Sequence, residues 1–322
     1  MKVQRRFSVS SSILNILQSV YVADDGKLGY VLGQECSAEN FDEMQSRLSQ
    51  AIYSNFHAGM RRVAPAEEIS FHRGDKEVEE LIRNATSVDH FEEEVQKAQY
   101  QNHLNSEDVT IAVIDGIKVS IPTNSITRDE TEYVTVRRSS LNYRLSLGFT
   151  YYRNQYPPTI ATPLLRVYRW ASRPEELLTS WSALIDLGER GRFPLQMKML
   201  SERESYPRND ALVVYISGSG LQFLEEIVHL LSTENTVATT SLFARKVANG
   251  VSLAWEPHDP ASYRKQLSFG EHRSEQLARG VIRSIRDSIP VASAIRATLL
   301  QGNIDPSNPS RNLTSPSLGL CL

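Results

Sequence analysis

Residues 193–200 read Phe-Pro-Leu-Gln-Met-Lys-Met-Leu, and this stretch decides how the second half of the chain is interpreted. Phe193, Leu195, Met197 and Met199 alternate with other residues, so they fall on one face of a strand and are expected to pack inward. Lys198 then points to the opposite face, where a lysine is ordinarily exposed to solvent. If that face forms the floor of a cleft, burial and nearby arginines would lower the pKa of Lys198 toward that of a usable base.

Strands and helices are expected to alternate around this lysine strand. Serine caps, a proline in a first helical turn and a capping box mark the helix starts, and β-branched apolar runs mark the strands. The expected elements are a strand at 164–170, a helix from Ser172 that Gly188 ends, strands at 193–200 and 211–217, and helices at 220–231, 268–287 and 291–300.

The middle of the chain is expected to be antiparallel. Two alternating runs between Val109 and Ile121 are joined by Asp115-Gly116, a pair that accepts the positive φ angles of a tight hairpin turn. Residues 133–138 and 141–153 continue as strands, and in the second of these Leu141 and Phe149 share one face.

The first hundred residues are expected to be helical. Apolar residues recur at three- and four-residue steps after Ile13 and from Asn40 to Gly59, and residues 75–100 are interpreted as two acidic helices. The fold class predicted is therefore α+β, with a helical subdomain at 1–104 and an α+β domain at 105–322 that together form one continuous globular unit.

Composition narrows the class of protein. The 322 residues are 40% hydrophobic and 23% charged, which is typical of an ordinary folded protein, and no run approaches the roughly 18 apolar residues of a membrane span. A formal net charge of −3 gives no reason to expect nucleic acid or a membrane as partner. Cys36 and Cys321 are too few for a disulfide framework or a zinc site and indicate reduced thiols in a cytoplasmic protein.

The motifs of nucleotide-binding and metal-dependent enzymes are missing. The sequence has no glycine-rich phosphate loop, no kinase catalytic loop and no H-E-x-x-H pair, so we expect neither a metal nor another cofactor.

Several basic side chains lie on ordered elements near Lys198. Arg166 is on the face of its strand that also carries Tyr168, and Arg208 and Asp210 stand just before the next strand. On spacing alone, Arg208 and Asp210 form an ion pair that braces a loop, although a guanidinium also suits phosphate oxygens. His272 is placed in the first turn of a helix, where the dipole opposes its protonation.

Six groups of segments, taken in order, resemble the HopA-type type III effector family, whose bacterial relatives include the lyase components of class V lanthipeptide and thioamitide biosynthesis. The match covers most of residues 160–315 and thins toward the N-terminus. The segments are Ile52–Gly59, Arg166–Tyr168 with Pro174-Glu175, Phe193–Tyr215, Leu242–Pro257, Ser268–Arg273 and Asp305–Leu313.

The resemblance implies a lyase-like domain that eliminates phosphate from phosphoserine or phosphothreonine in a precursor peptide, giving a dehydroamino acid. It implies as partners the precursor peptide, a kinase-like phosphotransferase that installs the phosphate, and a cyclase. Within it, Lys198 is the base and His272 the acid, with the exchange of these two roles left open. Arg166, Arg208 and Arg245 hold the phosphate, and Asp210 orients Arg208 or Lys198.

Two other functions are weighed against this one. The chain could be a secreted effector that binds a host protein without catalysis, or a peptide-binding module that keeps the fold but has no turnover. A secreted effector is expected to carry a long polar, Ser-rich leader, whereas helical periodicity here begins by about Ile13. That contrast favours the lyase in the cytoplasm over an effector secreted into a host cell.

Overall fold

The computed structural model describes residues 8–60, 74–98, 109–114, 116–157, 163–259 and 267–318. Within these ranges the chain combines α-helices with three antiparallel sheets, so the predicted α+β class is confirmed. None of the described helices is long and apolar enough to cross a membrane. The boundary expected between residues 104 and 105, and Cys321, lie outside the described residues.

A seven-stranded sheet forms the centre of the molecule. Its order is β14-β15-β11-β13-β12-β10-β9, and every neighbouring pair is antiparallel. The strands are β9 (Leu141–Ser146), β10 (Phe149–Arg153), β11 (Leu165–Ala171), β12 (Gln196–Leu200), β13 (Arg208–Ile216), β14 (Arg245–Ala248) and β15 (Val251–Trp255).

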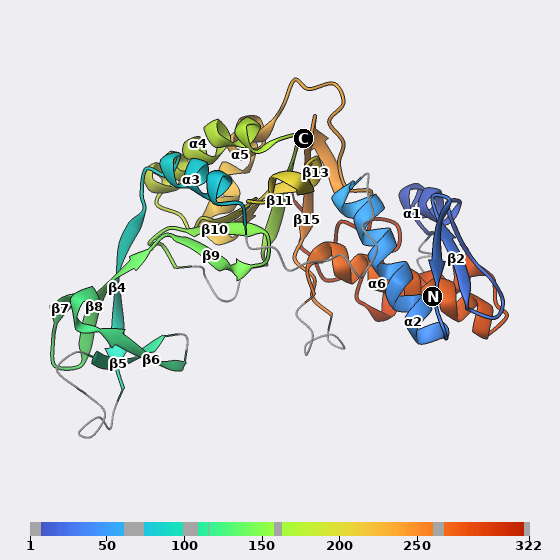
Figure 1. Cartoon of the computed structure of the whole chain (residues 1–322), viewed down its shortest axis with the longest axis horizontal. Helices are drawn as coiled ribbons and strands as arrows, with labels where there is room; N and C mark the ends of the chain where they lie inside the picture. The colour runs from blue at the N-terminus through green and yellow to red at the C-terminus, as the bar shows by residue number, and fades with distance from the viewer. Residues whose placement is uncertain are drawn as a thin grey trace, which may run out of the picture.

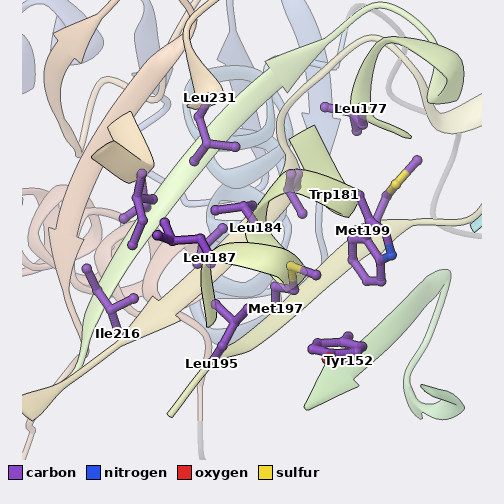
Figure 2. Close-up of a cluster of buried hydrophobic side chains, with 14 of the residues drawn as sticks. Tyr152, Leu177, Trp181, Leu184, Leu187, Leu195, Met197, Met199, Ile216 and Leu231 are labelled. Carbon is purple, nitrogen blue, oxygen red and sulfur yellow. The ribbon is translucent and has the colours of Figure 1, made fainter. Parts of the chain in front are cut away.

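One face of this sheet is covered by α3 (Lys76–Asn84), α4 (Leu178–Gly191) and α5 (Leu224–Leu231), as Figure 1 shows. Short 3₁₀ turns, η4 (Pro174–Leu177) and η6 (Gly218–Phe223), lead into α4 and α5. The inward residues of β12 pack against Trp181 and Leu184 of α4 (Figure 2). Met197 and Met199 are fully buried there, so the predicted inward face of the lysine strand is confirmed.

The opposite face carries the second helical layer. It contains α1 (Ser11–Leu17), α2 (Phe41–Ile52), the π-helix η1 (Tyr53–Ala58), α6 (Phe269–Arg286) and α7 (Val291–Gln301). A hydrophobic cluster joins these helices to Tyr168 of β11, Val213 of β13 and Ala254 of β15. The helices therefore cover the β15-β11-β13 part of the face, and Lys198 on β12 lies at the border of the covered part.

The capping box predicted at Ser268 is confirmed. The Ser268 hydroxyl accepts the backbone N–H of Glu271, and the Glu271 carboxylate accepts the N–H of Ser268, so α6 begins where the sequence indicates. Gly59 has a φ of 71° and ends η1 in the left-handed conformation, as its position after the helical pattern predicts.

A five-stranded sheet projects from one end of the molecule (Figure 1). Residues 109–114 and 117–122 pair as the predicted hairpin, with Ile114 opposite Ile117 and Gly116 at a φ of 78°, whereas Asp115 lies outside the described residues. The order is β6-β5-β4-β8-β7, from β4 (His90–Lys97), β5 (Val109–Ile114), β6 (Ile117–Pro122), β7 (Ile126–Asp129) and β8 (Tyr133–Ser139).

The N-terminal part contains more strand than the sequence predicts. A small antiparallel sheet is formed by β1 (Val20–Val22), β2 (Leu28–Val31) and β3 (Gln34–Ser37), because Gly26 and Gly33 adopt positive φ angles and turn the chain. The second acidic helix expected within 75–100 is wrong, because residues 90–97 form β4. There the Glu93 carboxylate binds Arg138 and Arg153.

Two boundaries also differ from prediction. Residues 141–153 form two strands rather than one, because Gly148 has a φ of 71° and the chain reverses there. Gly188 does not end its helix, which runs to Gly191. A side chain at residue 188 would have its Cβ 2.9 Å from Leu195, so glycine is needed there for close helix–sheet packing rather than for a stop.

Candidate functional site

A change of register in β13 builds the site. Arg169 pairs with Leu212 and Ala171 pairs with Arg208, so two steps along β11 correspond to four along β13. The regular alternation of side chains is interrupted at such an irregularity. Arg208 and Lys198 lie on the same side of the sheet, where both cations lie over the ring of Phe149.

Lys198 occupies a half-buried position on β12. It pairs with Val213 of β13 on one side and Tyr151 of β10 on the other, and its Nζ is 4.2 Å from the centroid of the Phe149 ring. Burial, assisted by the charges of Arg166 and Arg208 and opposed by Asp210, lowers its pKa from 10.5 to about 8. The direction of this shift agrees with the expectation from the sequence that burial and nearby arginines would lower the pKa of Lys198.

Arg208 and Asp210 form a buried bidentate pair. The Nε and Nη2 groups of Arg208 donate to the two carboxylate oxygens of Asp210 at 2.7 and 2.8 Å, and Nη2 also lies 3.1 Å from the Tyr53 hydroxyl. Burial raises the pKa of Asp210, but the charge and hydrogen bonds of Arg208 outweigh it and hold that pKa well below its usual range. Asp210 is thus held in its ionised form and pairs with Arg208 through both carboxylate oxygens.

Arg166 is held in the same way on β11. Its Nε and Nη2 groups donate to the carboxylate of Glu256, with 2.6 Å between Nη2 and Oε1, and its guanidinium carbon lies 5.1 Å from the centroid of the Tyr215 ring. A carboxylate therefore covers the Nε–Nη2 edge of both arginines. An anionic ligand would have to approach each guanidinium from the Nη1 side.

His57 is the histidine that the structure places in this site. It lies on η1 with its Nε2 4.0 Å from Asp210 Oδ2, and its ring centroid is 5.4 Å from those of Tyr53 and Tyr168. Burial lowers its pKa to about 4, Asp210 raises it, and the charges of Arg208, Arg166 and Lys198 lower it further. The imidazole is therefore neutral at pH 7.

Two contacts fix the orientation of the His57 ring. Its Nδ1 is 2.8 Å from Ser241 Oγ, and that oxygen already accepts the backbone N–H of Phe243. The serine hydroxyl can donate to Nδ1, and the carboxylate of Asp210 on the Nε2 side favours the same tautomer, with the ring proton on Nε2. Gly270 at the start of α6 makes room for the ring, because a Cβ there would lie 2.1 Å from its Cδ2 atom.

His272 and Lys198 lie in different surroundings. Both ring nitrogens of His272 are engaged, Nε2 with Asp259 Oδ2 at 3.0 Å and Nδ1 with Arg273 Nη1 at 2.6 Å. Burial, followed by the charge of Arg273, lowers the pKa of His272 to about 4. His272 thus belongs to a second polar cluster beside the one that contains Lys198.

The two clusters are connected through the C-terminal segment. Arg273 donates to the Pro309 carbonyl at 2.9 Å and to Asn312 Oδ1 at 3.0 Å, and the amide of Asn312 donates to the Glu256 carbonyl at 2.7 Å. Burial lowers the pKa of Arg273 to about 9. This chain of contacts ties the position of Glu256, and with it Arg166, to the start of α6.

Arg245 is the third arginine that the sequence assigns to phosphate binding. It is exposed on the edge strand β14 and lines a hollow of about 220 Å³ together with Trp255 and Arg311. The structure therefore brings Lys198, Arg166, Arg208 and Asp210 together, and it places Arg245 in another hollow and His272 in another cluster. Sequence reasoning missed Tyr53 and His57, whose four-residue spacing on a helix was the available signal.

The site places groups that could transfer a proton next to fixed cations. Lys198, Arg166 and Arg208 supply three positive charges, and the carboxylates of Asp210, Glu256 and Glu271 act on the same group of side chains. Among the described residues no group of histidine, cysteine and carboxylate side chains could hold a metal ion. Fold and site together define an α+β protein with a cluster of buried and half-buried basic side chains around Lys198 on one face of the central sheet.

The family model of the HopA1 effector protein family matches residues 140–311, just over half of the chain. The chain therefore belongs to that family, as the resemblance of its sequence predicts. No curated protein matches the chain at a significant level.

Among solved structures, it is similar to the effector protein from Pseudomonas syringae pv. tomato strain DC3000 at 12% identity, with a TM-score of 0.46, over 86% of this chain and 91% of that one. It is also similar to the effector protein from Pseudomonas syringae pv. syringae strain 61 at 14% identity, with a TM-score of 0.45, over 82% and 89% of the two chains.

Proposed function

We propose that Lys198, Arg166 and Arg208 line a substrate pocket, the lysine pocket, in which phosphate is eliminated from phosphoserine or phosphothreonine in a peptide, leaving a dehydroamino acid. The observation that carries the proposal is the half-buried Lys198, with a pKa of about 8, beside Arg166 and Arg208. In the reaction a base removes the α-proton, the electron pair forms the Cα=Cβ bond, and the Cβ–O bond breaks to release phosphate. A proton delivered to the bridging oxygen assists that departure.

Lys198 is the better base of the two groups in the pocket. General-base catalysis is most effective when the pKa lies near the working pH, and about 8 is closer to neutrality than the value of about 4 for His57. At pH 7 about one tenth of the Lys198 side chains would be neutral. The amine then takes the α-proton directly.

His57 is the better placed acid. It faces Asp210, and a dianionic phosphate bound beside Arg208 would raise the pKa of the imidazole and favour its protonated form. His272, the acid implied by the family resemblance, has both ring nitrogens occupied. Testing both histidines separates the two assignments.

The arginines bind phosphate from their Nη1 sides, since Asp210 and Glu256 hold the opposite edges. Two guanidinium groups fixed by carboxylates are already oriented before the substrate arrives, so little ordering is required when the phosphate binds. The partners of this proposal are the phosphorylated precursor peptide, the kinase-like protein that phosphorylates it, and a cyclase that uses the product.

Product identity is the direct test. Incubation with a phosphothreonine peptide should give a peptide lighter by one phosphoric acid, whereas hydrolysis would give back the threonine peptide. Lys198→Ala should bind the peptide and leave it intact, and His57→Gln should slow elimination more than His272→Gln. Equal activity of Lys198→Ala and the unaltered protein would refute the assignment of the base.

A second function is favoured by the family match itself, because the matching family is one of effector proteins. On this alternative the chain is delivered into a host cell by a type III system and binds a host protein through the same pocket. A translocation reporter fused to the full chain tests delivery. Delivery without elimination from any phosphopeptide would support this alternative over the lyase.

A further inference from the structure

A hollow lies beside the cluster that contains Lys198 and His57, because its lining residue Asn209 donates to the His57 carbonyl. It has a volume of about 240 Å³ and is formed by the end of η1, the last residues of β11, the first residues of β13 and the loop 237–242. Phe56, Trp170 and Pro207 supply its apolar walls, Asn209 is part of its lining, and Val237 and Leu242 stand at its rim.

The hollow and Lys198 are on the same face of the sheet. Arg166, Tyr168 and Trp170 alternate along β11 on that face, and Tyr168 is level with Lys198 because both pair with Val213. Trp170 is thus two strands and two residues away from Lys198. With strands 4.8 Å apart and 3.3 Å per residue, this corresponds to about 12 Å between their Cα atoms.

The hollow differs from the lysine pocket in its chemistry. The ten described residues that line it carry no charge. The Asn209 amide is already satisfied, because it donates to the His57 carbonyl at 2.9 Å and accepts from Thr239 Oγ1 at 2.7 Å. At the rim, Val237 is 62% exposed and Leu242 is 40% exposed, so apolar surface faces solvent there.

We propose that this hollow binds an aliphatic or aromatic side chain of the peptide whose phosphorylated residue occupies the lysine pocket. The inference rests on the proposed function for the identity of the peptide. An extended peptide advances about 3.4 Å per residue, so a separation of about 12 Å places the bound side chain three or four residues from the phosphorylated one. The hollow thereby selects among phosphopeptides, while the arginines bind the group common to all of them.

The test uses phosphothreonine peptides in which one leucine is moved along an otherwise glycine and alanine sequence. Affinity is measured by fluorescence anisotropy with the full-length Lys198→Gln variant, which keeps the hollow, and elimination is measured with the unaltered protein. A leucine three or four residues away, on one side, should tighten binding about tenfold, the scale expected for burying one such side chain. Leucine at the remaining positions should have little effect.

Substitution at the rim supplies the control. Val237→Asp combined with Leu242→Asp should remove the leucine preference and leave the affinity for the leucine-free peptide within about twofold. Leu313→Asp changes a residue that is equally exposed at 40% but outside the hollow, and it should keep the preference. If no leucine position alters binding, or if the rim variant keeps the preference, the inference is overturned.

The two proposals fail separately. A leucine preference that disappears in the rim variant, with no phosphate released by the unaltered protein, would retain the binding subsite and refute the lyase. Elimination from all peptides at the same kcat/KM would retain the lyase and refute the subsite.

Discussion

Asp210→Asn is the substitution for which the structure gives the sharpest expectation. The amide keeps the shape of the side chain but removes the charge that Arg208 binds through two hydrogen bonds in a site where both side chains are more than nine-tenths buried. Removing one partner of such a pair leaves the other charge buried and uncompensated. The free energy of unfolding should therefore fall by about 3–5 kcal/mol.

The pH dependence of that loss follows from the depressed pKa of Asp210. A carboxyl whose pKa is lower in the folded protein contributes stability above its unfolded pKa of about 3.9, and this contribution is lost as the pH falls through the folded value. The difference between the unaltered protein and Asp210→Asn should be largest near neutral pH and should shrink as the solution is acidified below about pH 4.

Urea unfolding at a series of pH values measures both quantities. Asp129→Asn is the matched control, because Asp129 pairs with Lys97 but is 59% exposed, and it should cost no more than about 1 kcal/mol. A loss below about 1 kcal/mol for Asp210→Asn, or a loss that does not change with pH, would refute the description of a buried ionised pair.

Three further predictions concern the groups around this pair. Gly270→Ala should destabilise the fold by about 1–3 kcal/mol in urea unfolding, since its Cβ would lie 2.1 Å from the His57 ring; an unchanged midpoint would contradict that packing. With a phosphopeptide, kcat/KM should rise with pH up to about 8 as Lys198 loses its proton, and a rate that falls over this range would exclude the lysine as base. Ser241→Ala should weaken the preference of His57 for the Nε2–H tautomer in ¹⁵N NMR spectra, and an unaltered spectrum would refute the role of that hydroxyl.

Local sequence signals predicted the elements that build the site. The alternation of residues 193–200 places Met197 and Met199 inward and Lys198 on the opposite face, as observed, because the side-chain period of a strand leaves no other arrangement. The capping box at Ser268 likewise gave the start of α6. The family was also predicted, because its segments are recognisable in order along the chain.

Tertiary contacts determine which residues meet in the site, and local sequence signals do not predict such contacts. His57 meets Asp210 and Ser241 only because η1 packs across the sheet, at separations of more than 150 residues in the chain. The irregular register of β13 next to Arg208 could not be predicted from alternation, which assumes a regular strand. The capping box predicts that His272 lies near the start of α6. Its contact with Asp259 could not be predicted in this way, because Asp259 precedes the helix in a loop.

The second acidic helix was wrong for a similar reason. Three consecutive glutamates have good helix propensity, yet residues 90–96 pair with β8, and Glu93 binds Arg138 of β8 and Arg153 of β10 in the central sheet. Tertiary pairing overrides propensity in such a segment.

Titration of the Lys198 side chain by NMR, with and without a bound phosphothreonine peptide, tests most directly whether Lys198 can act as the base beside a bound phosphate. The structure leads us to expect a midpoint near pH 8 in the free protein and a higher midpoint once the phosphate occupies the neighbouring arginines. A midpoint near that of an ordinary exposed lysine, unaffected by the peptide, would mean that Lys198 is not buried beside the arginines and does not contact the phosphate.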